Sequence, residues 1–404
     1  MAQLDRSRAG DRIMSILLEA SGAFATSILK VLGQEDPVCS VFFSLVSISF
    51  AMGMVLLGAK GSLVAEMAQA RALNTEKDIH GGFQSLLTQV HKSGDPFSFS
   101  IANKLFSTES FELLSSFQES CLTFYQGKQE QLSFAQAPES SRKHINVWVF
   151  RKTGGKIYEL LEKHSVHGVC RLVLINVVYF KGRWQEQFEK SSTMGLSFKI
   201  NQQEQRPVQM MCEEAMYPCA QEREVLELPY KGQGLSMVLL RLDKCVDLSK
   251  VEKALTFEQF QIWTSPEFMK RNEVQVCLPR FKLEEEYDMG SVLWALGILD
   301  VFHLGKADLS GMSPDSDLCL SKFMHKSVVE VNGEGMEVAA VSSCMVENYC
   351  DNKGRPEFCT DRPFLFFIRH NRTDQSLLCC GRFSSHKGCM PCVREHFHLF
   401  PQTL

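Results

Sequence analysis

The sequence predicts an α+β fold in one large domain, and two patterns indicate it. Apolar residues recur at helical spacing through most of the first third of the chain. From Leu172 onward, short apolar runs of the β type are mingled with further helical segments. Because this mixture lacks a strict strand–helix–strand alternation, α+β is favoured over a doubly wound parallel sheet.

Each predicted element has its own pattern. The uninterrupted run Leu172–Phe180 is typical of a strand buried on both faces, whereas Val274–Phe281 alternates apolar and polar residues. The other strands are expected at Val208–Cys212, Val225–Leu228, Met237–Leu242, Lys326–Val331 and Pro363–His370. Helices are expected at Ala20–Leu32, Leu63–Ala70, Phe83–Val90, Phe111–Phe124, Leu248–Thr264 and Met289–Leu296.

The stretch Pro37–Ala59 contains no charged residue, and on length alone it is a candidate transmembrane span. Its four serines lower the hydrophobicity, and its two glycines weaken a single long helix. We therefore favour a short strand at Val38–Phe43 followed by a buried helix at Ile48–Ala59.

Charge and cysteine content restrict the class of protein further. The net charge of −4 is spread along the chain, without the basic stripe that nucleic acids or anionic membranes need. The 15 cysteines are odd in number and irregularly spaced in a long chain, which predicts reduced thiols inside the cell. Six charged residues among the first 19 interrupt any apolar signal-peptide core. We expect a cytoplasmic protein, with the nucleus as a second location.

The two ends differ from the body of the chain. Residues 1–13 are polar without periodicity, and residues 386–404 are rich in Cys, His and Pro. Both are predicted to be disordered extensions of a domain that spans residues 14–385. The tail residues Cys389, Cys392, His396 and His398 include soft zinc ligands, but their spacing is too short for an ordinary zinc finger. We favour an unstructured tail and expect no metal site.

The segment Asn332–Phe358 lies between two apolar β runs and is too long for a hairpin turn. A loop of this length is usually functional or disordered. Its first half is mostly small and apolar, and residues two apart from Met336 to Val346 would share one face of a strand. This half therefore has the composition of a strand that is not yet in a sheet.

Several motifs around this loop resemble the serpin family, over roughly residues 14–385. The resemblance is strongest to the ovalbumin-type intracellular branch, clade B, and within it to the granzyme B inhibitor. The motifs lie at Ile145–Val149 with Thr153–Ile157 (INVWV and TGGKI), Leu172–Trp184 (LVLINVVYFKGRW), Leu278–Leu283 (LPRFKL), Ala307–Met312 (ADLSGM), His325–Gly335 (HKSVVEVNGEG) and Asp361–Ile368 (DRPFLFFI). Each motif is weak alone, but together they are very specific.

The resemblance implies three β-sheets, eight or nine helices and an exposed reactive loop at about residues 333–358. In this family a target protease cleaves the loop and is trapped as an acyl-enzyme when the loop inserts into the main sheet. Alignment of the hinge glycine places the scissile bond between Tyr349 and Cys350. An aromatic bait residue suits a chymotrypsin-like protease and not granzyme B, which needs an acidic residue. The implied hinge comprises Gly333, Glu334, Gly335, Met336, Glu337, Val338, Ala339, Ala340 and Val341.

Four further residues map onto the family's central switch under the main sheet. The resemblance implies that Ser44, Ser47, Asn176 and His325 hydrogen-bond to one another where the sheet opens. Without the motif around it, His325 would be interpreted as an ordinary core histidine. Leu45 stands where the family has proline.

The hinge departs from the family pattern, and this leaves two functions open. The family has an acidic residue at Gly333, threonine at Met336 and alanine at Val338 and Val341. Overpacking of an inward-facing site costs about 1–3 kcal/mol, and about 1.4 kcal/mol in the insertion barrier slows insertion tenfold. The favoured function is protease inhibition by trapping. The alternative is a non-inhibitory serpin that acts as a protease substrate, a carrier or a chaperone.

An enzyme is disfavoured, because the sequence has no nucleophile elbow, no phosphate-binding glycine loop and no HExxH helix. We expect no catalytic residues and no cofactor. The expected partner is a chymotrypsin-like serine protease, with no binding to nucleic acid or membrane, and the chain is expected to be a monomer.

Overall fold

The computed structural model describes residues 2–70, 79–90, 97–201, 203–220, 224–241, 248–315, 317–333, 357–371 and 376–384, with side chains from Glu19 onward. Its helices are α1 (Ala2–Glu35), α2 (Leu45–Gly58), α3 (Ser62–Gln69), α4 (Ile79–Val90), α5 (Ser115–Tyr125), α6 (Pro138–Lys152), α7 (Leu248–Ala254), α8 (Phe257–Trp263) and α9 (Met289–Ala295). Its strands are β1 (Val41–Phe43), β2 (Phe97–Thr108), β3 (Lys128–Leu132), β4 (Leu172–Gly182), β5 (Thr193–Lys199), β6 (Gln205–Ala220), β7 (Val225–Pro229), β8 (Leu235–Leu240), β9 (Lys270–Pro279), β10 (Phe281–Asp288), β11 (Leu320–Val331), β12 (Glu357–Cys359), β13 (Phe364–His370) and β14 (Ser376–Phe383). The predicted α+β class is confirmed.

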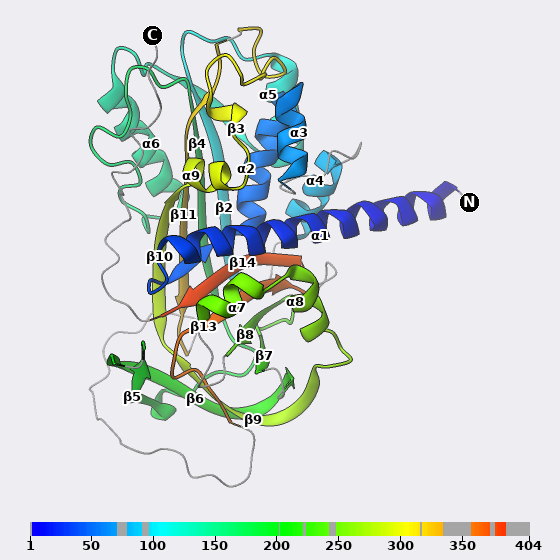
Figure 1. Cartoon of the computed structure of the whole chain (residues 1–404), viewed down its shortest axis with the longest axis vertical. Coiled ribbons are helices and arrows are strands. Elements are labelled where there is room, and N and C mark those ends of the chain that lie inside the picture. Colours follow the sequence, from blue (N-terminus) through cyan, green and yellow to red (C-terminus); the bar gives the residue numbers. More distant parts are fainter. Residues whose placement is uncertain are drawn as a thin grey trace.

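A five-stranded sheet in the order β10-β11-β4-β2-β3 forms the upper half of the molecule in Figure 1. Its middle strand β4 is buried along both faces, as its uninterrupted apolar run predicts. Val173, Ile175 and Val177 face the core under α6, whereas Leu174 and Val178 face the main core that contains α2. The sheet is therefore covered on both faces at its centre.

A second sheet has the order β1-β14-β13-β8-β7-β6-β9-β12, with β5 paired to β6, and fills the lower half of Figure 1. Strand β6 pairs with β9 over most of its length and with β7 at its end. The described strands thus form two sheets where the resemblance implies three, because this long strand pairs with β5, β7 and β9. The described part of the chain contains nine α-helices, within the number expected.

The uncharged stretch Pro37–Ala59 forms strand β1 and helix α2, as favoured above. Helix α2 is buried along almost its whole length, and the Ser44 side chain caps its start by accepting a hydrogen bond from the Ser47 amide. Among the described residues, no helix is both long enough and apolar enough to cross a membrane.

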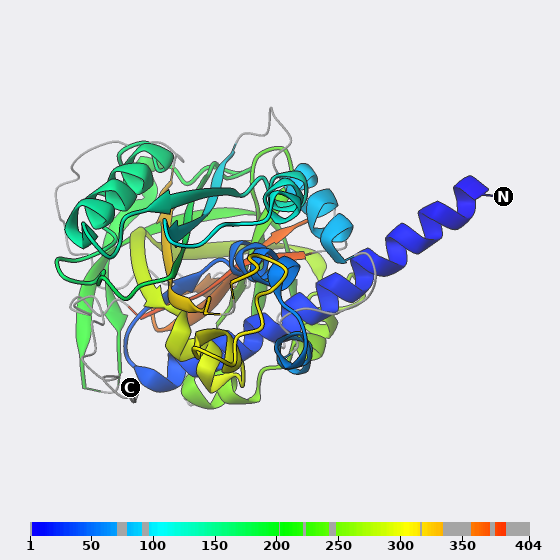
Figure 2. The ribbon, with the colours of Figure 1, turned by 90° about the horizontal axis from the view of Figure 1, so that it is seen from above.

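The prediction of a disordered segment over residues 1–13 differs from the structure, in which helix α1 begins at Ala2. Figure 2 shows this N-terminal part of α1 extending beyond the body of the molecule. From Phe24 to Leu32 the helix is packed into the core. The segment before it contains no proline, and a helix that is already nucleated adds each further residue at little cost.

The prediction of reduced thiols is wrong for the described cysteines Cys212 and Cys277, which form a disulfide with each other. These residues are directly opposite each other in the antiparallel pair β6–β9, with Cα atoms 4.3 Å apart. Such short Cα separations are typical of the non-hydrogen-bonded positions of an antiparallel ladder. The sequence spacing of the two cysteines does not reveal that they face each other.

Most of the predicted elements are present, with two notable differences. The helical segment Leu248–Thr264 is divided into α7 and α8, because Thr256 forms a capping box with Gln259 and starts a new helix. Strand β2 lies in the region predicted to be mostly helical, and it pairs with β4 along most of its length. Its burial pattern lacks the strict alternation that identifies a strand from sequence.

Candidate functional site

The candidate site is the boundary between β4 and β11 at the centre of the five-stranded sheet, which we call the seam. Ten residue pairs join these two strands, from Leu320 opposite Leu172 to Glu330 opposite Lys181, and the strands are parallel. Parallel pairing is slightly less stable per residue than antiparallel pairing. A strand that follows β11 and turns back into the seam would be antiparallel to both neighbours.

A hydrogen-bonded cluster crosses the seam on the side of α2. His325 of β11 lies directly opposite Asn176 of β4, and its Nδ1 is hydrogen-bonded to the Asn176 side-chain oxygen. Asn176 Nδ2 donates to the Ser47 carbonyl oxygen at 3.0 Å and also contacts the Ser47 hydroxyl. The Ser44 amide donates to His325 Nε2 at 3.1 Å. The structure thus brings together the four predicted switch residues from three separate parts of the chain.

One member of this cluster was missed by the sequence analysis. Asn103 of β2 lies opposite Asn176, and its side-chain oxygen accepts a hydrogen bond from Asn176 Nδ2. Asn103 belongs to a strand that was not predicted, so nothing in the sequence placed it near β4. The central cluster is therefore Ser44, Ser47, Asn103, Asn176 and His325.

His325 is neutral in this environment. Because Nε2 accepts the hydrogen bond from the Ser44 amide, the ring proton must be on Nδ1, where it is donated to Asn176. Complete burial lowers the pKa of His325 to about 3. The ring of Tyr287, on the neighbouring strand β10, lies parallel to the His325 imidazole, with ring centroids 6.5 Å apart. Tyr287 therefore packs against His325 from the side of the edge strand.

The cluster also ties the seam to the second sheet. The Ser44 hydroxyl donates to the Leu378 carbonyl of β14 at 3.0 Å, and the Ser327 hydroxyl donates to the Phe42 carbonyl of β1 at 2.7 Å. Opening the seam beside Ser327 or His325 would therefore disturb bonds that hold the two sheets together. This arrangement is able to resist sheet opening through specific polar contacts.

Contacts at the C-terminal ends of β4 and β11 hold the start of the loop. The Trp184 indole donates to the Asn332 carbonyl at 2.8 Å, directly after β11 ends. At Gly333 an added Cβ would lie 2.9 Å from the Phe188 carbonyl oxygen, which is closer than such atoms normally approach. Glycine is thus matched to this position, where the family has an acidic residue.

An unusual carboxylate lies near this end. Glu213 of β6 has one buried oxygen for which the described residues provide no hydrogen-bond partner. Burial raises the pKa of Glu213 to about 7, and the charges of Glu186 and Glu189 act in the same direction. A protonated Glu213 is therefore populated near neutral pH.

Most of the predicted loop residues lie outside the described part of the chain. Gly333 is the last described residue before the loop, and β12 follows the loop with three residues paired in parallel to β9. The loop is thus attached to two different sheets. The predicted hinge and bait residues outside the described ranges are Glu334, Gly335, Met336, Glu337, Val338, Ala339, Ala340, Val341, Tyr349 and Cys350.

The described residues contain no group of three or more His, Cys, Asp or Glu side chains placed to hold a metal ion. The tail residues Cys389, Cys392, His396 and His398, for which no metal site is expected, lie outside these residues. The site therefore consists of a sheet seam, its polar cluster and the two anchors of a long loop.

Family comparison identifies the class of protein to which this fold and site belong. Residues 19–386 match the family model "Serpin (serine protease inhibitor)", so the chain belongs to the serpin family. The predicted family is confirmed.

Similar proteins place the chain in the ovalbumin-type branch. It is 56% identical to human Serpin B9 over 376 residues, which cover 92% of this chain and 100% of that protein. It is 42% identical to the horse leukocyte elastase inhibitor over 380 residues, with the same coverage. Uncleaved ovalbumin, 32% identical, superposes with a TM-score of 0.83 and covers 92% of this chain and 100% of its own. The predicted similarity to clade B serpins is confirmed.

Proposed function

We propose that this protein is an intracellular inhibitor of serine proteases that works by loop cleavage, acyl-enzyme trapping and loop insertion. The observation that carries the proposal is the closed, parallel seam between β4 and β11, with the loop leaving directly from the end of β11. Membership of the serpin family supports inhibition in general. A similar protein is itself named an elastase inhibitor.

The energy for trapping follows from the geometry of the seam. An inserted strand would replace one parallel ladder of ten residue pairs by two antiparallel ladders. The gain is one additional ladder, and about ten hydrogen bonds at about 0.5–1.5 kcal/mol each give a net stabilisation on the order of 10 kcal/mol. Insertion is therefore expected to be strongly favourable once cleavage frees the loop from β12.

The proposed bait bond lies between Tyr349 and Cys350, and the proposed target is a chymotrypsin-like protease in the cytoplasm or nucleus. An aromatic bait residue fits the apolar specificity pocket of such proteases. The protein is proposed to act as a monomer, with the protease as its partner. The central cluster of Ser44, Ser47, Asn103, Asn176 and His325 is proposed to control how easily the seam opens.

Incubation with chymotrypsin tests the proposal. A covalent complex that survives denaturing electrophoresis is expected, and Tyr349→Ala should abolish it. Sequencing of the released C-terminal peptide should place the cut after Tyr349. Cleavage at Tyr349 without any complex, in wild type and at several protease ratios, would contradict inhibition by trapping.

The altered hinge supplies the alternative, a serpin that is cleaved without trapping. Restoration of the family residues in the double variant Met336→Thr, Val338→Ala should raise the fraction of complex over cleaved product if only hinge packing limits insertion. Heating after cleavage gives an independent measurement. A cleaved chain whose melting temperature does not rise above that of the intact chain has not inserted its loop and would support the non-inhibitory alternative.

A further inference from the structure

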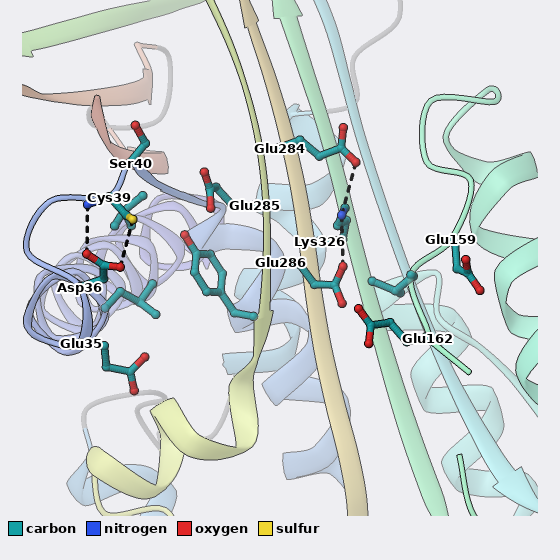
Figure 3. Close-up of a pocket in the computed structure, with 14 residues that line it drawn as sticks. Glu35, Asp36, Cys39, Ser40, Glu159, Glu162, Glu284, Glu285, Glu286 and Lys326 are labelled. Carbon is teal, nitrogen blue, oxygen red and sulfur yellow. Dashed lines mark hydrogen bonds and ion pairs between the residues drawn. The ribbon is translucent and has the colours of Figure 1, made fainter. Parts of the chain in front are cut away.

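The acidic cavity beside the edge strand β10 does not by itself indicate a ligand. Its volume is about 390 Å³, and seven of its fourteen lining residues are carboxylates (Figure 3). Glu284 and Glu286 of β10 both pair with Lys326 of β11, at 3.3 and 3.1 Å (Figure 3). Acidic side chains on an edge strand also oppose pairing with the sheet of a second molecule. Both observations give the carboxylates of β10 a structural role.

Three cysteines lie next to one another on three neighbouring strands of the second sheet. Cys212 of β6 is opposite Cys277 of β9, and Cys277 is also paired in register with Cys359 of β12. Residues that are paired in register lie on the same face of a sheet. The three side chains accordingly pack in one hydrophobic cluster. We call Cys212, Cys277 and Cys359 the cysteine row, and Cys277 is its middle member.

The members of the cysteine row differ in bonding and in exposure. Cys212 and Cys277 are joined by the disulfide, and each of them is 5% exposed. Cys359 carries a thiol, is only partly buried, and lies on the last strand in the order of the sheet. A thiol with access to solvent is thus placed beside a disulfide that thiols in solution reach poorly.

Backbone contacts hold Cys359 against β9. The Thr360 amide and the Thr360 hydroxyl both donate to the Cys277 carbonyl, each at 2.9 Å. Arg241 Nη1 donates to the Cys359 carbonyl at 3.1 Å, and its guanidinium lies over the Phe358 ring. These contacts keep Cys359 one strand spacing from Cys277. That spacing is about 4.8 Å, within the roughly 4.4–6.8 Å between Cα atoms that a disulfide requires.

The order of the row favours attack on the middle sulfur. In thiol–disulfide exchange a thiolate attacks one sulfur of the disulfide while the other sulfur leaves from the opposite side. Cys359 and Cys212 flank Cys277 on opposite sides, because β12 and β6 are the two neighbours of β9. Reactants that are held in such an arrangement react in an effectively unimolecular step.

We propose that the cysteine row is an internal thiol–disulfide exchange site, at which Cys277 changes its partner from Cys212 to Cys359. The Cys359 thiol loses its proton to solvent, and the thiolate forms a bond with the Cys277 sulfur. The bond between Cys212 and Cys277 breaks, and Cys212 leaves as a thiolate that takes up a proton. No electrons are gained or lost overall, so the exchange needs no oxidant or reductant.

The two bonded forms constrain different strands. The first form joins β6 to β9, which already pair along most of their length. The second form joins β9 to β12, whose pairing with β9 covers only three residues. In the second form β12, the strand that follows the long loop, cannot separate from β9 by loss of hydrogen bonds alone. This inference does not depend on protease inhibition.

A disulfide map of the full-length protein tests the exchange. The chain is incubated at about pH 8, where thiolates are populated, then denatured in acid, alkylated with N-ethylmaleimide at about pH 5 and digested without reduction. Mass spectrometry should find two isomers, one with Cys212 bonded to Cys277 and one with Cys277 bonded to Cys359. The third cysteine should be alkylated in each isomer. A bond between Cys212 and Cys277 in every molecule after prolonged incubation, or a bond between Cys212 and Cys359, would overturn the proposal.

Single substitutions test the two forms separately. Cys212→Ser should allow oxidised glutathione to join Cys277 to Cys359, whose thiols lose two protons and two electrons while the glutathione disulfide becomes two thiols. Cys359→Ser should keep the bond between Cys212 and Cys277 in every molecule. Cys219→Ser, which removes another buried thiol of β6, is the matched control and should give the same two isomers as the wild type. Alkylated Cys277 in the oxidised Cys212→Ser variant would refute the pairing with Cys359.

Hydrogen exchange tests the effect on β12. In Cys212→Ser, the amides of residues 358–360 should exchange at least several-fold more slowly after oxidation than after reduction, because the new bond holds β12 to β9. In Cys359→Ser, the same amides should exchange at equal rates in both states. Rates that oxidation leaves unchanged in Cys212→Ser would overturn the proposed constraint on this strand.

Discussion

The neutral state of His325 predicts a specific pH dependence of stability. The perturbation is a change from pH 7.5 to pH 5.0, applied to the wild type and to His325→Gln. The pKa of His325 is about 3 in the folded protein, against an ordinary value of about 6.5 in the unfolded chain. The unfolded chain therefore binds more protons at this site, and stability must fall as the pH decreases from about 6.5 toward 3.

The magnitude follows from this difference in pKa. Above pH 6.5 the site contributes no pH dependence, because the imidazole is neutral in both states. At pH 5.0 the unfolded imidazole is protonated and the folded one is not, which lowers the free energy of unfolding by about 2 kcal/mol. Each further unit of pH down to about 4 adds roughly 1.4 kcal/mol.

Urea unfolding at the two pH values measures the effect. Other groups titrate in this range, and Glu285, whose pKa is raised to about 7 by burial, acts with the opposite sign. The relevant quantity is therefore the decrease in the free energy of unfolding between pH 7.5 and pH 5.0, compared between wild type and His325→Gln. We expect this decrease to be about 2 kcal/mol smaller in the variant. His144→Gln, whose ring is half exposed, controls for the removal of a histidine. Equal losses in wild type and His325→Gln would refute the assignment of a buried neutral imidazole.

Three further changes test the fold around the site. Arg382→Ala removes the guanidinium whose Nη1 donates to both carboxylate oxygens of the buried Glu252 and should lower the free energy of unfolding by about 3–5 kcal/mol. Addition of Glu252→Leu should restore much of this loss in a urea titration, and no recovery would contradict the ion-pair explanation. Trp184→Phe removes the donor to the Asn332 carbonyl and should lower the free energy of unfolding by about 1–3 kcal/mol. The melting temperature of the intact chain should fall accordingly, and an unchanged melting temperature would contradict this role of Trp184. Glu213→Gln should stabilise the protein most above pH 7 and have little effect at pH 4, because the pKa of this carboxyl is raised from 4.5 to about 7 and its ionised form is therefore costly in the folded state. An equal effect at both pH values would count against that cause.

Local pattern was sufficient for the elements that are buried on both sides or strongly periodic. The uninterrupted run Leu172–Phe180 indicated the central strand β4, and the uncharged stretch Pro37–Ala59 indicated β1 and α2. These predictions were correct because burial of a regular helix or strand requires apolar residues at regular positions in the sequence. Strand β2 was not predicted because its burial does not alternate, and the start of α1 was not predicted because its polar sequence has no helical period.

The central cluster could be predicted only in part. Ser44, Ser47, Asn176 and His325 were linked through family motifs, and Asn103 was missed because it lacks any motif of its own. Ser44 and His325 are 281 positions apart, and no local pattern encodes a contact at that distance. Their meeting depends on the register of β4 against β11 and on the position of α2.

The sequence alone established the serpin family, the α+β class and the position of the loop between two apolar strands, because these depend on composition, periodicity and local motifs. Only the tertiary structure decided that the seam is parallel and closed, that His325 is neutral, and that Cys212 faces Cys277. It also brought Ser384, which follows β14, beside Ser40, which precedes β1. Strand register and long-range packing determine these relations, since each joins residues that chain connectivity leaves free to be far apart.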